Sequence, residues 1–357
     1  MGHDRRMKQT VAFDVAQDGN RIDIQSDGLD ACFAVEGISL PPNADPSFAV
    51  WGLLPLAMEE GFDLCINQPI DPEVAANAER LSRIWEMWVP SRYRSVKVSG
   101  GGGWSEVRHP RLPLVHLFSG GIDSTFSLLR NQDPKGNGFA ATVCGVDLIE
   151  ESNLARLVDK TEPLLKSLGY RRIIIRNDVH REPSALTHGF TLASCLFLLS
   201  GLFEEGTIAA DSTHVEDMAT VPWGTNHVTN EYFAGSNFSV RTVGADMRRT
   251  EKIAAIAAAG LDLHSLSFCR KRHTLPANCG TCRKCIRTKA MFLVATGNIP
   301  EIFVDSSFND TLMKRTFQKY SHRVHLFDIY FQAKDRGIEN EVPGLAALMD
   351  KYRSDEF

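Results

Sequence analysis

The sequence between Pro113 and Ala210 alternates short apolar runs with longer amphipathic segments, and this alternation limits the fold more than any other feature. Four runs have the composition of buried parallel strands, namely 114–118, 141–149, 172–176 and 206–210. Three segments between them have the apolar spacing of helices, namely 123–130, 153–168 and 187–202. Strands and helices in this order predict an α/β fold, in which helices cover both faces of a parallel sheet. Ligands of such sheets bind beside the carboxyl ends of the strands.

The chain is expected to have three parts. Residues 1–105 predict a small α+β accessory domain, whose expected elements are a strand hairpin and two helices, at 11–24, 48–60 and 72–88. The glycine run 100–103 marks a flexible joint to the α/β domain, which we expect over 112–295. The remaining residues, 296–357, predict a helical C-terminal extension with no recognisable site pattern.

Composition places the chain among ordinary globular proteins. Of its 357 residues, 43% are hydrophobic and 23% are charged, which excludes disorder, collagen-like repeats and coiled coils. The formal net charge of -5 provides no field that would attract nucleic acid or anionic lipid, so neither is an expected partner. No export signal is visible, and the longest apolar run, 190–202, is shorter than the ~20 residues that span a bilayer. We expect a cytoplasmic protein with no membrane contact.

The strongest local motif lies directly after the first strand and before the first helix of the alternating segment, and it reads Ser119-Gly120-Gly121-Ile122-Asp123-Ser124-Thr125. Adjacent glycines allow a tight turn, and the N–H groups that begin a helix point outward at the positive end of its dipole. The hydroxyls of Ser119, Ser124 and Thr125 add further donors. The turn therefore predicts an anion site, for which phosphate is the usual ligand.

Two better-known nucleotide loops do not fit this turn. The sequence lacks the Gly-x-x-x-x-Gly-Lys-Ser/Thr pattern of P-loop NTPases, and the glycines are not spaced as Gly-x-Gly-x-x-Gly. Asp123 would repel a phosphate unless a cation intervenes, so we interpret it as a carboxylate that organises Mg²⁺ beside a pyrophosphate. The alternative is an ordinary Gly-Gly turn in which Asp123 caps the helix. The strand before the turn and the helix after it favour the nucleotide.

Four of the eight cysteines form a second motif, whereas the other four are scattered among apolar neighbours. The clustered residues have the spacing C-x9-C-x2-C-x2-C and are Cys269, Cys279, Cys282 and Cys285. Four thiolates at this spacing can surround one tetrahedral Zn²⁺, and Gly280 lets the chain turn back toward the sulfurs. Without an export signal, clustered cysteines indicate metal rather than disulfides. We expect structural zinc, because protein fills all four positions; an iron–sulfur cluster can use the same ligands.

Seven cationic residues accompany these cysteines in the sequence, namely Arg270, Lys271, Arg272, Arg283, Lys284, Arg287 and Lys289. We interpret them as the shell that screens a four-cysteine zinc site, whose net charge is about -2. An RNA-facing patch is the alternative, and the absence of global basicity disfavours it.

The turn 119–124 matches the SGGxDS signature of the PP-loop ATP pyrophosphatases, the N-type group of the HUP superfamily, and the chain resembles this family. The resemblance implies a HUP-like sheet and ATP whose β,γ-pyrophosphate binds the turn while a substrate oxygen attacks the α-phosphate. Together with the late cysteine motif, it extends to the 7-cyano-7-deazaguanine synthases, in which the cysteines hold structural zinc. The likeness covers roughly 112–295. The chain more closely resembles a synthase-like branch with an extra N-terminal domain.

Further site residues are expected from the resemblance and from the predicted sheet. The resemblance implies that Lys252, with Arg249, neutralises the departing phosphates; an exposed charged first turn is the alternative. Asp147 stands at the end of the second strand, where it is placed to face the adenosine. Asp211 follows the fourth strand at the ligand edge, where it is placed to position substrate or magnesium. Asp211 can equally cap the next helix.

Three weaker features lie nearby. His214 follows Asp211 and shares its two interpretations. The loop 223–227 is polar with one aromatic residue, which suits either ring stacking or a surface turn. His188 is interpreted as a polar residue at a helix start rather than as a base.

These features predict an ATP-dependent, ligase-type enzyme that forms a C–N bond and releases AMP and pyrophosphate, with Asp123 and Ser124 at the reaction centre. A carboxylate or carbonyl of a small molecule, protein or peptide attacks phosphorus, and a nitrogen nucleophile then displaces AMP. No glutaminase pattern is visible, so the expected donor is free ammonia or an amine. The alternatives are a PP-loop sulfurtransferase that thiolates tRNA and a non-catalytic nucleotide-binding module. A homodimer is left open.

Overall fold

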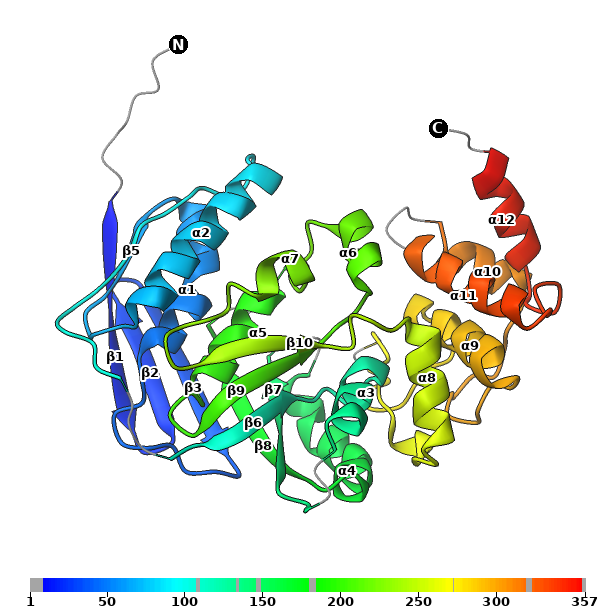
Figure 1. Ribbon diagram of the computed structural model, residues 1–357, viewed down its shortest axis with the longest axis horizontal. Helices are drawn as coiled ribbons and strands as arrows, with labels where there is room; N and C mark the ends of the chain where they lie inside the picture. The colour runs from blue at the N-terminus through cyan, green and yellow to red at the C-terminus, as the bar shows by residue number, and fades with distance from the viewer. Residues whose placement is uncertain are drawn as a thin grey trace, which may run out of the picture.

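The structure is a computed structural model that describes residues 9–106, 110–132, 135–145, 149–179, 184–271, 273–318 and 323–354. Within these ranges ten strands form one sheet in the order β10-β9-β6-β7-β8-β3-β2-β1-β4-β5 (Figure 1). The strands are β1 (Thr10–Asp18), β2 (Arg21–Ser26), β3 (Leu29–Glu36), β4 (Asp63–Ile66), β5 (Val98–Gly100), β6 (Leu112–Leu117), β7 (Gly138–Cys144), β8 (Tyr170–Asn177), β9 (Phe203–Ala209) and β10 (Ser239–Val243).

Helices cover both faces of the sheet, which confirms the α/β prediction. They are α1 (Ser47–Glu60), α2 (Pro72–Trp88), α3 (Ile122–Arg130), α4 (Glu151–Ser167), α5 (His188–Phe197), α6 (His214–Thr220), α7 (His227–Asn230), α8 (Arg249–Ala258), the 3-10 turn η1 (Leu263–Ser265), α9 (Arg283–Thr296), α10 (Asp310–Thr316), α11 (Arg323–Asp335) and α12 (Leu345–Ser354). One apolar layer packs α1, α2 and α5 on the sheet, and a second contains α3, α4, α8 and α9. Every helix in the described ranges is too short or too polar to span a bilayer.

The strands β10, β9, β6, β7 and β8 are parallel. The chain passes from β6 to β7 and β8 on one side and then crosses to β9, which pairs with β6 on the other side. β6 and β9 therefore form a topological switch point, and ligands of parallel sheets bind in the crevice beyond the carboxyl ends of such strands. The turn 119–125 follows β6 and Asp211 follows β9, so both lie at this crevice.

The N-terminal region continues the same sheet. β3 pairs antiparallel with β8, where Phe33 lies opposite Asn177. Helix α1 packs against the α/β region, and the Trp51 ring meets the Phe233 ring edge-on with centroids 5.3 Å apart. One apolar layer contains buried residues of both regions. The boundary at residue 105 stays a prediction, but the two regions share part of their core.

Some elements differ from their expected extents. The strand expected over 141–149 ends at Cys144, because Gly145 begins a turn with φ +97° and donates its N–H to the Ile149 carbonyl over 2.7 Å. The helix expected over 187–202 ends at Phe197, and turns over 198–202 lead into β9. β3, β4, β5 and β10 lie outside the predicted set, since small or polar residues interrupt their apolar pattern.

The C-terminal helices lie at the end of the molecule opposite β1 to β5 (Figure 1). Asp328 on α11 accepts hydrogen bonds from the N–H of Thr250 at 3.2 Å and from its hydroxyl at 2.6 Å. These bonds satisfy donors in the first turn of α8. Because α8 carries Arg249 and Lys252, the C-terminal region helps to fix the helix that supplies two predicted site residues.

Candidate functional site

The turn 119–125 is a tight bend between β6 and α3. Gly120 has φ +79°, and a Cβ there would lie 2.8 Å from the Thr161 side chain, so the position requires glycine. The Gly120 carbonyl accepts a hydrogen bond from the Ser267 N–H at 2.8 Å, and this bond fixes the bend to the segment that contains Ser267. In the described part of the chain, the N–H groups of residues 120–124 donate to no acceptor. The bend therefore leaves its donors available to a ligand.

Ser124 closes the bend. Its Oγ donates to the Gly121 carbonyl at 3.2 Å and accepts from the Ser119 N–H at 3.3 Å. Gly121 is the N-cap of α3, and within the described residues no side-chain hydrogen bond caps this helix. The alternative in which Asp123 caps the helix is therefore wrong, and the Asp123 carboxylate has other partners.

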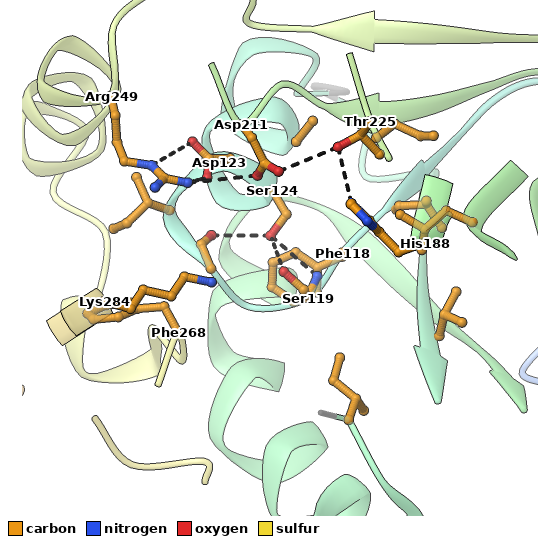
Figure 2. A pocket seen from close by; sticks show the side chains of 18 of the residues that line it. Phe118, Ser119, Asp123, Ser124, His188, Asp211, Thr225, Arg249, Phe268 and Lys284 are labelled. Carbon is orange, nitrogen blue, oxygen red and sulfur yellow. Dashed lines mark hydrogen bonds and ion pairs between the residues drawn. The ribbon is translucent and has the colours of Figure 1, made fainter. Parts of the chain in front are cut away.

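Asp123 forms an ion pair with α8 (Figure 2). Arg249 Nε donates to Asp123 Oδ1 at 3.1 Å, Nη2 of the same guanidinium donates to Oδ2, and Lys252 Nζ lies 3.6 Å from Oδ1. Burial by itself would raise the pKa of Asp123, but the charges of Arg249 and Lys252 outweigh it and lower the pKa to about 2. Burial opposes the charge on Arg249, yet Asp123 raises the pKa of that guanidinium. Both groups are charged at neutral pH.

Lys252 lies behind Asp123 rather than in the crevice. Its Nζ donates to the Ala210 carbonyl at 2.7 Å, and its side chain is 1% exposed. It lines neither of the two cavities described below. Contact of Lys252 with departing phosphates stays a prediction, while its observed contact is with Asp123.

A row of hydrogen bonds runs along the other wall of the crevice (Figure 2). Asp211 Oδ2 accepts from Trp223 Nε1 at 3.3 Å and from Thr225 Oγ1 at 3.5 Å. His188 Nε2 lies 3.3 Å from the same Thr225 hydroxyl. The structure thus brings together Asp211, the loop 223–227 and His188, and such a row can hold or pass a proton at the crevice.

Two adjoining cavities occupy the crevice. The smaller one lies on the turn and has a volume of about 100 Å³. The larger one has a volume of about 620 Å³ and extends past the cysteine segment to residues of α10 and α11. Both are lined by Ser119, Ile149, His188, Asp211, Arg249, Phe268 and Lys284. The shared residues make the two cavities neighbouring parts of one site.

Most of the predicted binding residues line this site, namely Ser119, Gly121, Ile122, Asp123, Ser124, Asp211 and Arg249. Gly120 and Thr125 line neither cavity, and Thr125 is fully buried. Asp147 lies outside the described residues.

Asp211 suits Mg²⁺ better than Asp123 does. Magnesium takes oxygen ligands, usually one or two carboxylates together with phosphates and waters. Both oxygens of Asp123 accept hydrogen bonds from Arg249, so direct coordination would require that guanidinium to move. The Asp211 side chain is 44% exposed, and its Oδ1 lies 3.9 Å from Arg249 Nη2. Of the two carboxylates, Asp211 is therefore the more accessible to a cation, and a magnesium ion there stays a prediction.

Lys284 lines both cavities, although the sequence does not predict it as a binding residue. Figure 2 shows its side chain extending from α9 toward Ser119 and Ser124, and its charge contributes to the low pKa of Asp123. In the sequence it stands beside Cys285, which favours its interpretation as part of a screening shell. Only the packing of α9 against α8 places it over the turn. Phe268, also unpredicted, lines both cavities.

The four clustered cysteines meet in space, as predicted. Their sulfurs all lie within 4.8 Å of one another. The Sγ atoms of Cys269 and Cys282 are 4.0 Å apart, and those of Cys279 and Cys285 are 3.9 Å apart. A tetrahedral site with Zn–S bonds of about 2.3 Å places its sulfurs about 3.8 Å apart, so the donor set fits zinc.

Backbone groups support the cysteine cluster. Cys279 Sγ accepts from the N–H of Thr281 at 3.4 Å and of Cys282 at 3.3 Å. Gly280 has φ +82°, and a Cβ there would collide with the Asp305 carbonyl. These contacts are typical of a turn that encloses a metal.

The cationic residues of this segment divide into groups. Lys271 donates to Thr281 Oγ1 at 2.8 Å, and Lys289 is buried and donates to the Asp305 and Ser307 carbonyls. Arg270, Arg283, Lys284 and Arg287 line the larger cavity, and Arg272 lies outside the described residues. Burial, with repulsion from Arg249, lowers the pKa of Arg287 to about 9. The interpretation as a uniform screening shell is therefore too simple.

Comparison of the chain with sequence models of protein families, with curated proteins and with solved structures found no match in any of the three. The geometry of the crevice and the signature in its turn are thus the grounds for a functional proposal.

Proposed function

We propose that this chain is an ATP-dependent adenylylating enzyme related to the PP-loop ATP pyrophosphatases, and among them to the 7-cyano-7-deazaguanine synthases. The observation that carries the proposal is the bend 119–125, whose N–H groups from 120 to 124 are unpaired at a switch-point crevice within the described residues. Arg249 and Lys284 line the same crevice. Unpaired amides at a helix start, together with two cations, match the charge of a triphosphate tail.

In this proposal the β,γ-pyrophosphate binds the amides of the bend. Arg249 and Lys284 compensate the charge that grows on the pyrophosphate as it leaves, and Asp123 keeps Arg249 extended and charged. Asp211 would be the protein ligand of Mg²⁺, which supplies further charge neutralisation. An oxygen of a carboxylate or carbonyl acceptor attacks the α-phosphate, and a nitrogen nucleophile then displaces AMP. The four cysteines would hold Zn²⁺ in a structural role.

The sulfurtransferase alternative has less support. A persulfide carrier needs a reactive thiolate. Burial, reinforced by the charge of Glu151, raises the pKa of Cys144 to about 11, and burial raises the pKa of Cys195 still further. Both thiols are protonated at neutral pH. Cys32 and Cys65 line neither cavity, whereas Cys269 and Cys282 line the larger one. The clustered cysteines are then the better candidates to carry sulfur, and a role as metal ligands would occupy them.

Turnover of ATP tests the proposal. The protein would be incubated with ATP, Mg²⁺ and, one at a time, small carboxylates, deazaguanine carboxylates and peptides, each with and without ammonium. We expect acceptor-dependent pyrophosphate release and an adenylylated species detectable by mass spectrometry. Asp211→Asn should lower the rate about 100-fold, a typical effect of losing one electrostatic group at a reacting phosphate.

Asp159→Asn is the matched control, because this carboxylate is exposed on α4 and lines neither cavity. If the protein binds α,β-methylene-ATP but releases no pyrophosphate from ATP with any acceptor, it is a non-catalytic nucleotide-binding module. Absence of nucleotide binding would disprove the proposal altogether.

A further inference from the structure

The larger cavity is strongly cationic, although the whole chain has a net charge of -5. Its lining includes one carboxylate, Asp211, and the thiols of Cys269 and Cys282, which a zinc ion would hold as thiolates. Against these stand five cations, namely Arg249, Arg270, Arg283, Lys284 and Arg287. Arg283, Lys284 and Arg287 all stand in the first turns of α9, where the positive end of the helix dipole disfavours cations. A cavity with this lining attracts an anionic ligand.

The triphosphate tail does not account for all of these cations. Arg249 and Lys284 line both cavities, but Arg270, Arg283 and Arg287 line only the larger one. Lys284 and Arg287 are three residues apart on α9 and therefore share a face of that helix. The cationic lining thus continues beyond the bend that would hold the pyrophosphate.

Arg287 is the central residue of this extension. The Nε atom of Arg287 is buried, and its N–H has no hydrogen-bond partner in the described part of the chain. A buried donor that stays unpaired costs free energy, and an oxyanion bound in the cavity would supply the acceptor that this N–H lacks.

The remaining walls indicate what else the ligand carries. Trp223, Leu275 and Phe317 line the same cavity and offer apolar surface of the size of a ring. Phe317 follows α10 and His325 belongs to α11, so the C-terminal region forms part of this wall. A volume of about 620 Å³ is ample for a ring-sized body with charged substituents.

We propose that the larger cavity binds the acceptor through an oxyanion, a carboxylate or a phosphate, that is held by Arg287 and is distinct from the group that is adenylylated. The identity of the ligand as acceptor rests on the proposed function. The subsite itself does not.

The experiment fills the bend first and then titrates the larger cavity. The full-length, zinc-loaded protein is saturated with α,β-methylene-ATP and Mg²⁺, and binding of isophthalate, benzoate and inorganic phosphate is measured by calorimetry. We expect isophthalate to bind more tightly than benzoate, and Arg287→Gln to weaken isophthalate at least tenfold while Arg287→Lys weakens it less. Arg83→Gln, an exposed residue on α2, should bind as the wild type does. Zinc content and circular dichroism check that each variant is folded.

The outcomes separate the two proposals. Competition between the ATP analogue and isophthalate would assign the cations to the triphosphate and overturn the subsite, as would equal binding by wild type and Arg287→Gln or the absence of binding by every probe. Arg287-dependent binding of isophthalate in a protein that does not bind the analogue would support the subsite while the adenylylation proposal fails. Tighter binding of phosphate than of isophthalate would support the subsite with a phosphate-bearing acceptor.

Discussion

Arg249 on α8 donates hydrogen bonds to both carboxylate oxygens of Asp123 on α3, and this pair of residues, 126 positions apart in the sequence, joins the two helices. The two side chains are 8% and 12% exposed. In such surroundings each charge depends on the other, because water no longer solvates either one. The pair therefore holds the crevice together and determines the charge that it presents.

Removal of one member of this pair should destabilise the fold. We expect Arg249→Met and Asp123→Asn each to lower the free energy of unfolding by about 3 kcal/mol, which is the lower end of the range for breaking a buried ion pair. The loss is moderate because Lys252 still lies near Asp123 when Arg249 is replaced, and Asp211 still lies near Arg249 when Asp123 is replaced. The double variant should lose less than the sum of the two. Urea unfolding with unchanged m-values measures this.

The exposed pair of Arg130 and Asp246 is the matched control for that cycle. Its side chains are 43% and 56% exposed, so Arg130→Met should cost less than about 1 kcal/mol. Equal losses at both pairs would contradict the importance assigned to burial.

Lys284→Met should weaken nucleotide binding without unfolding the protein. The side chain extends from α9 toward the bend, so its loss removes a cation from the site (Figure 2). We expect the dissociation constant of α,β-methylene-ATP to rise about tenfold, equivalent to ~1.4 kcal/mol for one charge-assisted contact. Lys166→Met, an exposed lysine on α4, should leave both affinity and stability unchanged. Unaltered affinity in Lys284→Met would remove Lys284 from the site.

Asp328 should make stability depend on pH. Burial, reinforced by the charge of Glu216, raises the pKa of Asp328 to about 6 although Thr250 donates hydrogen bonds to it. The folded chain thus holds a proton between about pH 4 and pH 6 that the unfolded chain releases. The stability that Asp328 contributes is fully present below about pH 4 and is lost as the pH rises through 6, by at most about 3 kcal/mol.

Asp328→Asn keeps an oxygen for Thr250 but cannot ionise. Chemical unfolding from pH 4 to pH 7 should therefore show wild type losing stability relative to this variant as the pH rises. Asp335→Asn, an exposed position on the same helix, should follow the wild type. Parallel curves for wild type and Asp328→Asn would rule out the raised pKa.

The cysteine cluster should contain one zinc ion per chain. We expect Cys279→Ser to lose the metal and to unfold at a much lower temperature, since metal binding at a closed site contributes directly to folding. Cys65→Ser in β4 keeps all four clustered sulfurs and should retain the metal. Elemental analysis and thermal unfolding measure both effects. Visible absorbance with iron in place of zinc would identify an iron–sulfur cluster instead.

Much of the site could be predicted because its information is local. The bend 119–125 follows from adjacent glycines between a strand and a helix, and the cysteine cluster follows from its spacing. Both are short segments in which consecutive residues determine the backbone conformation and the spacing of the side chains. The alternation of strands and helices was equally readable, and it placed Asp211 at the correct edge of the sheet.

Long-range packing decided the rest, because no local pattern encodes which distant surfaces meet. The resemblance implies a phosphate contact for Lys252, which stays a prediction, while the approach of α8 to α3 decided that Lys252 contacts Asp123 and that Arg249 lines the crevice. In the sequence, Lys284 and Arg287 have the same pattern as the other cationic residues near the cysteines. The position of α9 beside the bend decides that both line the larger cavity. Likewise, hydrogen bonds between β3 and β8 joined the N-terminal strands to the sheet, and pairings between distant strands depend on the whole core rather than on either strand alone.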